Sequence, residues 1–205
     1  MRQVIKAQGY TWNHKRLRRV YCELKLNLRR KPKKRFPARE KIILSQPLQP
    51  NYCWSIDFMS DVLSNGNKFR TFNILDDFNR EGLGILIAKS MPAKCVINYL
   101  DFIASCRGYP KIIRSDNGPE FISKDFLQWA HKSHIEIKHI QPGKPAQNAF
   151  IERFNRTYRE DVLDAYWFTS IAEVQQITDD WLNEYNYLRP HEALKNLSPI
   201  DFLRS

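Results

Sequence analysis

The sequence predicts an α/β domain in which helices flank a mixed five-stranded sheet, preceded by a basic helical N-terminal arm. Two observations support this fold class. Segments with the alternation of strands and segments with helical spacing of apolar residues are interleaved between residues 53 and 187. Charge is also uneven, because residues 1–41 hold 15 Lys and Arg against two acids, whereas the remainder holds 18 against 20. We therefore divide the chain into an arm at residues 1–50 and a domain at residues 51–205.

The arm begins with a helix predicted over about residues 9–28. Asn13 is a suitable cap, and apolar residues such as Leu17 and Leu24 then recur at helical spacing. A run of six basic residues follows around the helix-breaking Pro32, namely Arg29, Arg30, Lys31, Lys33, Lys34 and Arg35. Such a basic arm beside a near-neutral domain is typical of a protein that binds a polyanion. The alternative is a solvated, partly disordered segment.

Three antiparallel strands are predicted to open the domain. Residues 53–62 alternate around Trp54 and Ile56, and the sequence Ser-Asn-Gly-Asn at residues 64–67 is a strong hairpin turn. Residues 69–76 then pair back on the first strand. A third strand is expected at residues 84–88, after a polar turn.

The second half of the domain alternates between helices and short strands. Pro92 favours a helix start, and the helical spacing of apolar residues continues to about Gly108. Short strands are predicted at residues 111–115 and 135–140, with a helix at residues 124–132 between them. Two further helices are expected at about residues 147–163 and 171–187. This order predicts a mixed sheet covered by helices.

Composition excludes several classes of protein. Hydrophobic residues make up 42% of the chain and aromatic residues 13%, which is enough for a core and argues against global disorder. The four cysteines are scattered without a Cys-x-x-Cys pair, so neither a disulfide framework nor a zinc knuckle is expected. No apolar stretch approaches the ~18 residues of a membrane span. We therefore expect a soluble, cytoplasmic protein.

Three carboxylates stand out because each lies in an unusual local sequence. Asp57 lies within the first predicted strand, on the face opposite Ile56 and Phe58. Asp116 follows the fourth strand, and Glu152 lies on a helix, with 35 residues between it and Asp116. Individually they have ordinary alternatives: a solvated strand residue, a turn residue before Gly118 (which we expect at positive φ), and a helix surface residue. Together, carboxylates from distant segments can hold two divalent ions for phosphoryl displacement. The chain is therefore predicted to cut and rejoin nucleic-acid backbones.

The sequences around these carboxylates carry a family resemblance. They are Trp-Ser-Ile-Asp-Phe at residues 54–58, Ser-Asp-Asn-Gly-Pro-Glu-Phe at residues 115–121, and Pro-Ala-Gln-Asn-Ala-Phe-Ile-Glu-Arg-Phe-Asn at residues 145–155. They closely resemble the DDE integrase catalytic core and, more narrowly, the OrfB-type transposases of the insertion-sequence-3 family. Asn-His-Lys-Arg at residues 13–16 and Asp-Asp-Phe-Asn-Arg at residues 76–80 extend the match. The fold this resemblance implies is the ribonuclease-H-like fold.

The resemblance implies a Mg²⁺-dependent (or Mn²⁺-dependent) polynucleotidyl transferase. Asp57 would bridge two metal ions, and Asp116 and Glu152 would each complete one. The implied activity is cleavage of DNA phosphodiesters and transfer of 3′-hydroxyl ends into target DNA, without a covalent enzyme intermediate or ATP. Family members usually act as multimers on DNA with a helix-turn-helix partner protein. A ribonuclease H or another nuclease is the weaker enzymatic alternative.

The chain also departs from the family pattern, because it begins late relative to the Asn-His-Lys-Arg sequence. The alternative from another class is therefore a truncated, catalytically silent remnant that only binds DNA or regulates its parent transposase. A third, intermediate possibility is a chain whose catalytic triad is intact but which does not recognise its DNA site.

The helix that carries Glu152 is predicted to bind DNA beside the metal ions. Helical spacing brings Asn148, Glu152, Asn155, Arg156 and Arg159 to one side of it. We expect Asn148, Arg156 and Arg159 to contact DNA, together with Lys144 from the loop before the helix. The alternative is a solvated helix face. Because this loop leads directly into the helix, we expect Glu152 to reach its position only when DNA binds.

Two aromatic residues and a histidine near the C-terminus invite a functional interpretation as ligands or stacking groups. They are Trp181, Tyr185 and His191. We expect them instead to pack in the core and against the C-terminal segment.

Overall fold

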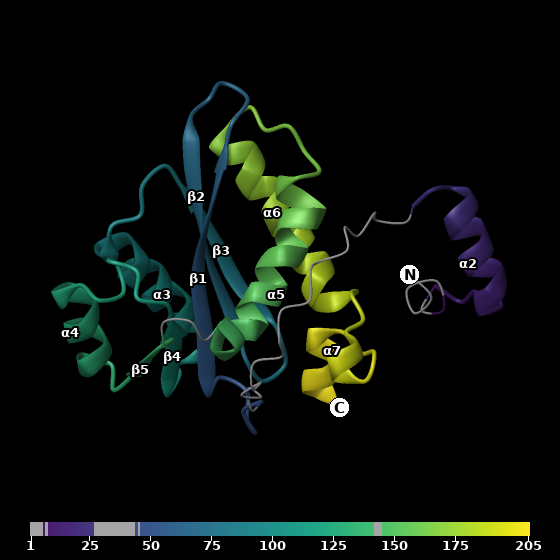
Figure 1. Ribbon diagram of the computed structural model, residues 1–205. Coiled ribbons are helices and arrows are strands. Elements are labelled where there is room, and N and C mark those ends of the chain that lie inside the picture. The colour runs from purple at the N-terminus through teal and green to yellow at the C-terminus, as the bar shows by residue number, and fades with distance from the viewer. Residues whose placement is uncertain (1–5, 7, 27–43, 45, 142–144) are drawn as a thin grey trace.

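The computed structural model describes residues 6, 8–26, 44, 46–141 and 145–205. Within this part, a five-stranded sheet lies between two layers of helices, with α5 and α6 on one face and α3 and α4 on the other (Figure 1). The basic run at residues 29–35 and Lys144 lie outside the described residues. The predicted contacts of these basic residues with DNA therefore stay predictions.

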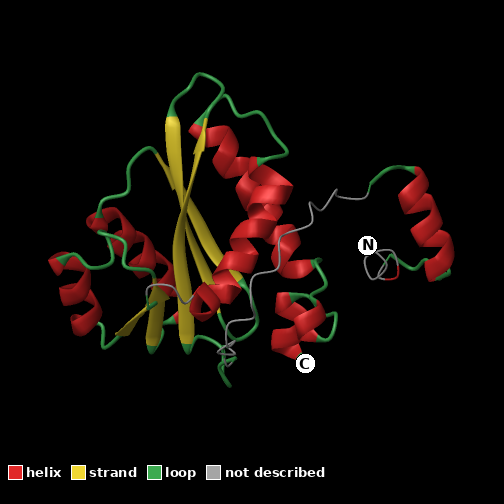
Figure 2. Ribbon diagram, in the orientation of Figure 1, coloured by secondary structure: helices red, strands yellow, loops and turns green. Residues whose placement is uncertain are grey.

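The sheet has the strand order β3-β2-β1-β4-β5. The first three strands, β1 (Cys53–Val62), β2 (Lys68–Asp76) and β3 (Gly82–Ala88), form an antiparallel meander. The last two, β4 (Ile112–Ser115) and β5 (Glu136–His139), run parallel to β1 (Figure 2). The predicted mixed five-stranded sheet flanked by helices is therefore confirmed.

The described helices are α2 (His14–Glu23), α3 (Ala93–Arg107), α4 (Lys124–Lys132), α5 (Ala149–Tyr158), α6 (Ile171–Tyr187) and α7 (Pro199–Arg204). Of these, α3 to α6 cover the two faces of the sheet, and α7 packs on α6 (Figure 1). A 3₁₀ turn (Pro145–Asn148) precedes α5, a π-helical turn (Arg159–Leu163) continues it, and a second 3₁₀ turn (Glu192–Leu194) follows α6. Among the described residues, no helix is long and apolar enough to cross a membrane.

Alternation along β1 divides the core in two. Trp54 and Ile56 belong to a cluster that includes α3 and α4 residues. The opposite face of the sheet packs on α5 and α6, where Phe154 and Trp181 contribute to a second cluster. Asp57 therefore points to the α5 side, as its position between apolar neighbours predicts.

Most differences from the predicted elements concern their ends. Asn13 caps α2 by accepting a hydrogen bond from the Lys15 backbone N–H at 2.9 Å, as expected. The helix ends at Glu23 rather than near residue 28, because Lys25 adopts a left-handed conformation with φ of 54°. The helix predicted over residues 147–163 is divided into a 3₁₀ turn, an α-helix and a π-helical turn.

A buried polar network joins the strands beneath the site. The Asp77 carboxylate accepts hydrogen bonds from the Ser55 hydroxyl at 2.6 Å and the Cys53 thiol at 3.3 Å, and it pairs with the guanidinium of Arg114. Asp77 is fully buried, and the Arg114 side chain is only 15% exposed. The network therefore ties the β2–β3 turn to both β1 and β4, the two strands that carry Asp57 and Asp116.

Replacing Asp77 with alanine should destabilise the fold, because Arg114 would keep a largely buried charge without a partner. We expect Asp77→Ala to lower the free energy of unfolding by about 3–5 kcal/mol in urea denaturation at pH 7. The matched control is Glu136→Ala, which removes an exposed carboxylate from β5 and should change the same quantity by less than about 0.5 kcal/mol. Equal losses for the two variants would contradict this role of the network.

Candidate active site

The site is built around Asp57, whose carboxylate is held between β1 and α5. Its Oδ2 accepts a hydrogen bond from the Asn155 side-chain amide at 2.7 Å, and its Oδ1 accepts one from the Phe58 backbone N–H at 2.8 Å. The amide of Asn155 is itself fixed, because its oxygen accepts a hydrogen bond from Asn73 at 2.7 Å. Asn73 is the partner of Asp57 in the β1–β2 register. One carboxylate oxygen is thus oriented by a chain of two buried amides.

Asp116 lies at the end of β4, next to β1. The parallel register pairs Ser55 with Arg114, and two further residues along each strand bring Asp57 level with Asp116. The Asp116 Oδ1 accepts a hydrogen bond from the Gly118 backbone N–H at 2.9 Å, which closes the turn. The expectation of a positive φ at Gly118 was wrong, because among the described glycines only Gly9, Gly66 and Gly108 have one. The Asp side chain stabilises this turn without a left-handed residue.

Glu152 lies in the first turn of α5 and is exposed. It precedes Asn155 by three residues, so it lies on the flank of the helix that faces Asp57. The three predicted catalytic residues therefore come together from β1, the end of β4 and the first turn of α5. Among the described residues, however, no group of three or more His, Cys, Asp and Glu side chains is placed closely enough to hold a metal ion.

The neighbouring carboxylates act on Asp57 through their charge. Burial above all, together with the charges of Asp116 and Glu152, raises the pKa of Asp57 to about 6, although the hydrogen bonds from Phe58 and Asn155 lower it. A buried carboxylate with other carboxylates nearby suits a divalent cation, and oxygen-only ligands suit Mg²⁺ and Mn²⁺. By donor chemistry the residues fit such an ion, although their present separation does not form a closed ligand set.

The sequence did not reveal the role of two asparagines. Asn155 was predicted to lie on the polar side of α5, and Asn73 was an ordinary polar residue in a strand. Asn73 is 0% exposed, and a buried amide needs hydrogen-bond partners. The hairpin register, which sets Asn73 opposite Asp57, was the one signal that could have drawn attention to it.

The predicted DNA-binding residues of α5 differ in their surroundings. Arg156 is exposed, whereas Arg159 pairs with Asp61 at 3.2 Å and with Asp164 at 3.5 Å. Asn148 is only 4% exposed, and its side-chain oxygen is buried without a hydrogen-bond partner. The described geometry thus leaves Arg156 as the α5 candidate best able to reach a phosphate.

The aromatic residues near the C-terminus pack as expected. Trp181 and Tyr185 are buried in the second core cluster, where both rings pack against the Phe154 ring. His191 packs edge-on against Tyr185, with ring centroids 4.9 Å apart, but it is only half-buried and lines a cavity.

Comparison with known sequences agrees with this arrangement. Family models described as integrase core domain match residues 47–145 and 133–199. An uncharacterized 31.7 kDa protein of insertion element IS407 from Burkholderia multivorans is 41% identical over 199 residues, which span 97% of this chain and 72% of that protein. The chain belongs to the insertion-element transposases with an integrase core domain.

A second relative of this transposase also comes from an insertion element. It is an uncharacterized 39.2 kDa protein of insertion element IS476 from Xanthomonas euvesicatoria, 40% identical over 204 residues. The match spans 98% of this chain but 58% of that protein. Among solved structures, the HTLV-2 integrase catalytic core domain in complex with magnesium superposes with a TM-score of 0.56 at 19% identity, over 76% of this chain and 97% of that domain. The ribonuclease-H-like fold of integrase cores is thereby confirmed.

The buried charge of Asp57 should make stability depend on pH. Because its pKa is about 6 in the folded state and 3.8 as an ordinary carboxyl, the native state favours the protonated form. Stability from this group is complete below about pH 3.8 and is lost as pH rises through about 6. We expect Asp57→Asn to be more stable than wild type at pH 8 by on the order of 2 kcal/mol, and about equally stable at pH 4.

The measurement is urea denaturation of both proteins in EDTA at the two pH values. Comparing the variant with wild type at each pH cancels the titration of the other carboxylates. A stability difference that is the same at pH 4 and pH 8 would contradict the raised pKa of Asp57.

Proposed function

We propose that this chain carries out the metal-dependent DNA cleavage and strand transfer of a transposase, with Asp57, Asp116 and Glu152 as its catalytic residues. The observation that carries the proposal is the position of Asp57 on the central strand beneath α5, where the charges of Asp116 and Glu152 act on it, in a chain of the integrase core family. DNA ends would be the substrate, and a 3′-hydroxyl would be joined to target DNA. The alternative of a catalytically silent DNA-binding remnant stays open to the test below.

Two Mg²⁺ or Mn²⁺ ions would be held by Asp57, Asp116 and Glu152, and when bound they supply activation of the attacking oxygen and stabilisation of the leaving oxygen. The related HTLV-2 domain was solved with magnesium, which supports this choice of ion. Asn155 would fix the direction of the Asp57 carboxylate through its 2.7 Å hydrogen bond. Residues of the first turn of α5 would bring Glu152 towards the other two carboxylates when metal and DNA are bound.

DNA contacts would surround this centre. Arg156 is exposed one turn after Glu152, so it would contact a phosphate beside the metal ions. The basic arm at residues 1–50, with its run from Arg29 to Arg35, would add sequence-independent attraction to DNA. A helix-turn-helix partner protein and a multimer on paired DNA ends remain part of the proposal. The chain spans 58% of the length of the relative from insertion element IS476. The activity of a whole transposase is therefore part of the proposal.

Loss of the Glu152 carboxylate should abolish the chemistry without abolishing DNA binding. In a Mg²⁺-dependent strand-transfer assay on a pre-cut element end, we expect Glu152→Gln to reduce product at least about 10³-fold, since electrostatic stabilisation of the transferring phosphoryl group is lost. The matched control is Glu160→Gln, an exposed carboxylate further along the same helical segment, which should retain activity. If Glu152→Gln and wild type gave the same products, the catalytic assignment would fail; no product from wild type would favour the silent remnant.

The phosphate contact proposed for Arg156 should appear in the salt dependence of DNA binding. We expect Arg156→Ala to lower the slope of log K against log salt concentration by about 0.9, the value for one phosphate contact. Lys94→Ala removes an exposed charge from α3 on the opposite face of the sheet and should leave the slope unchanged. Arg159→Ala reports separately on whether Arg159 leaves Asp61 to reach DNA. An unchanged slope in Arg156→Ala rules the Arg156 contact out.

A further inference from the structure

A cavity of about 810 Å³ lies beside α5, on the flank away from the catalytic carboxylates. We call it the arginine cavity after three of its lining residues. The residues that matter for its chemistry are Arg80, Phe150, Arg153, Tyr185, Arg189 and His191. They come from the β2–β3 turn, the first turns of α5, and the end of α6 with the segment after it. These three segments lie far apart in the sequence and meet only in the folded chain.

Arginines outnumber carboxylates in the lining of the arginine cavity. Glu192 is the one carboxylate in its lining. Arg189 pairs with Asp161, but in the described part of the chain neither Arg80 nor Arg153 forms an ion pair. Asp77 and Asp76 act on Arg80 across the turn, yet Asp77 is committed to Arg114 and Ser55, and Asp76 accepts hydrogen bonds from two backbone N–H groups. The cavity therefore has the electrostatics of an anion site.

Two buried polar atoms in the same lining lack partners. They are an Nη1 atom of Arg80 and the Nε2 atom of His191, and neither has a hydrogen bond within the described residues. A buried donor without a partner costs free energy, so such atoms commonly mark a place where a ligand binds. Burial together with the charges of Arg189, Arg80 and Arg153 lowers the pKa of His191 to about 4. His191 is therefore neutral at pH 7, and its Nε2–H tautomer can donate to an anion.

The position of the cavity relates it to the catalytic site. Phe150, Arg153 and Thr157 line it from one flank of α5, whereas Glu152 and Arg156 lie on the other flank. The two flanks of α5 are separated by the width of a helix, about 10 Å. One DNA strand covers that distance in about three nucleotides, at about 3.4 Å each. The first turn of α5 also borders the cavity and adds the partial positive charge of a helix N-terminus.

We propose that the arginine cavity binds a backbone phosphate of DNA, about three nucleotides from the phosphate that reacts beside Glu152. Arg80, Arg153 and the neutral imidazole of His191 donate to its oxygens. This inference rests on the proposed function for its DNA ligand, but it concerns binding rather than chemistry. It gives the C-terminal segment after α6 a part in holding the DNA strand.

The contact should not depend on base sequence. The rings of Phe154 and Tyr185, which also border the cavity, are buried in the second core cluster, and the Phe150 ring is covered by the Arg80 guanidinium, whose carbon lies 3.4 Å from the ring centroid. That face of the ring is therefore not available for stacking with a base. Charge and hydrogen bonds to phosphate remain, and these carry no sequence information.

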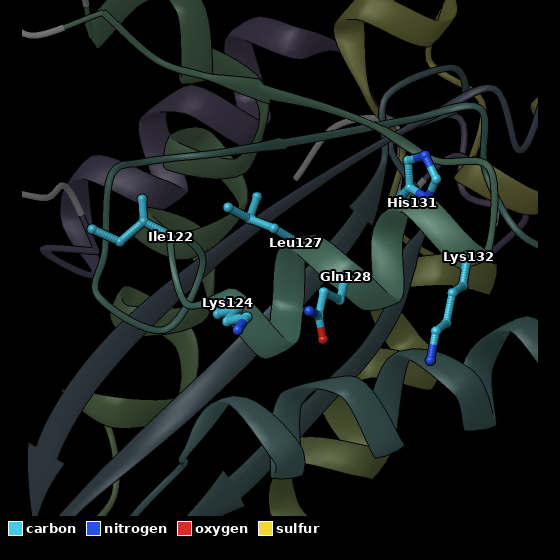
Figure 3. Close-up of a pocket in the computed structure, with 6 residues that line it drawn as sticks. All are labelled: Ile122, Lys124, Leu127, Gln128, His131 and Lys132. Atoms are coloured by element: carbon cyan, nitrogen blue, oxygen red, sulfur yellow. The ribbon is translucent and has the colours of Figure 1, made fainter.

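A second hollow, of about 700 Å³, provides a control. It lies over α4 and is lined by Ile122, Lys124, Leu127, Gln128, His131 and Lys132 (Figure 3). Its two lysines lie at opposite ends of α4, on the other face of the sheet, and its lining includes the exposed Ile122 and Leu127 (Figure 3). None of its lining side chains is among the buried polar atoms without partners found in the described residues. Lys132→Ala thus removes one positive charge without touching the arginine cavity.

The test compares DNA binding by wild type, Arg153→Ala, Arg153→Lys and Lys132→Ala. Arg153 is exposed and without an ion pair among the described residues, so its loss should leave the fold intact, which a thermal melt verifies. Fluorescence anisotropy with a short DNA duplex in EDTA, over a range of salt concentrations, measures affinity and slope. We expect Arg153→Ala to bind about 3–10-fold more weakly and to lose about 0.9 of the slope. Arg153→Lys should keep the slope, and Lys132→Ala should match wild type in both quantities.

A second arm distinguishes DNA from a free anion. Inorganic phosphate should raise the melting temperature of wild type more than that of Arg153→Ala, because it is a small probe of the same donors. If that difference appears while the DNA slopes of Arg153→Ala and wild type are equal, the cavity takes a free anion and the DNA assignment is overturned. Arg153→Ala behaving like Lys132→Ala in both arms, or wild type failing to bind DNA, also overturns it.

These outcomes are separate from those of the proposed function. EDTA removes the divalent ions, so no reaction occurs and the binding result does not depend on Glu152. An inactive wild type with a slope that depends on Arg153 would refute the strand-transfer proposal alone. An active wild type with equal slopes would refute the arginine cavity alone.

Discussion

The arrangement of the site depends on one interaction, the hydrogen bond from the Asn155 amide on α5 to the Asp57 carboxylate on β1. It joins the helix that carries Glu152 to the strand in the middle of the sheet. Because Asn73 holds Asn155 in turn, the direction of this amide is set by the β1–β2 register. Packing of Phe154 and Tyr158 in the second core supplies the force that keeps α5 in place. The position of the acidic site is thus a consequence of ordinary core formation.

The burial that comes with this position carries a cost, which the Asn155 hydrogen bond only partly offsets. The Asp57 carboxylate lies beneath a helix, where it is poorly solvated, and two other carboxylates are nearby. Both conditions raise its pKa. When all three carboxylates are ionised, the protein is less stable than it would be with a neutral amide in place of Asp57. A bound divalent cation would offset the repulsion between the carboxylates. Stability is therefore given up at Asp57 for a site that gains most from the ion it is proposed to bind.

The fold and the triad were accessible from the sequence for different reasons. Alternation in β1 and helical spacing in α6 are local signals, so those elements matched their expected bounds. Asp57, Asp116 and Glu152 were recognised because each lies in a distinctive local sequence. Asn73 and the arginine cavity depend on contacts between distant segments, such as the approach of α5 to the β2–β3 turn, which no local pattern encodes. Gly118 was misjudged because the Asp116 side chain closes the turn by itself.

The most direct test of this account is a crystal structure of the protein soaked with Mn²⁺, examined by anomalous scattering. The account predicts a manganese peak within ligand distance of an Asp57 carboxylate oxygen and of Asp116 or Glu152, and its loss in Asp57→Asn. A structure with ordered carboxylates and no peak at Asp57, under conditions where Mn²⁺ supports strand transfer, would contradict the central claim.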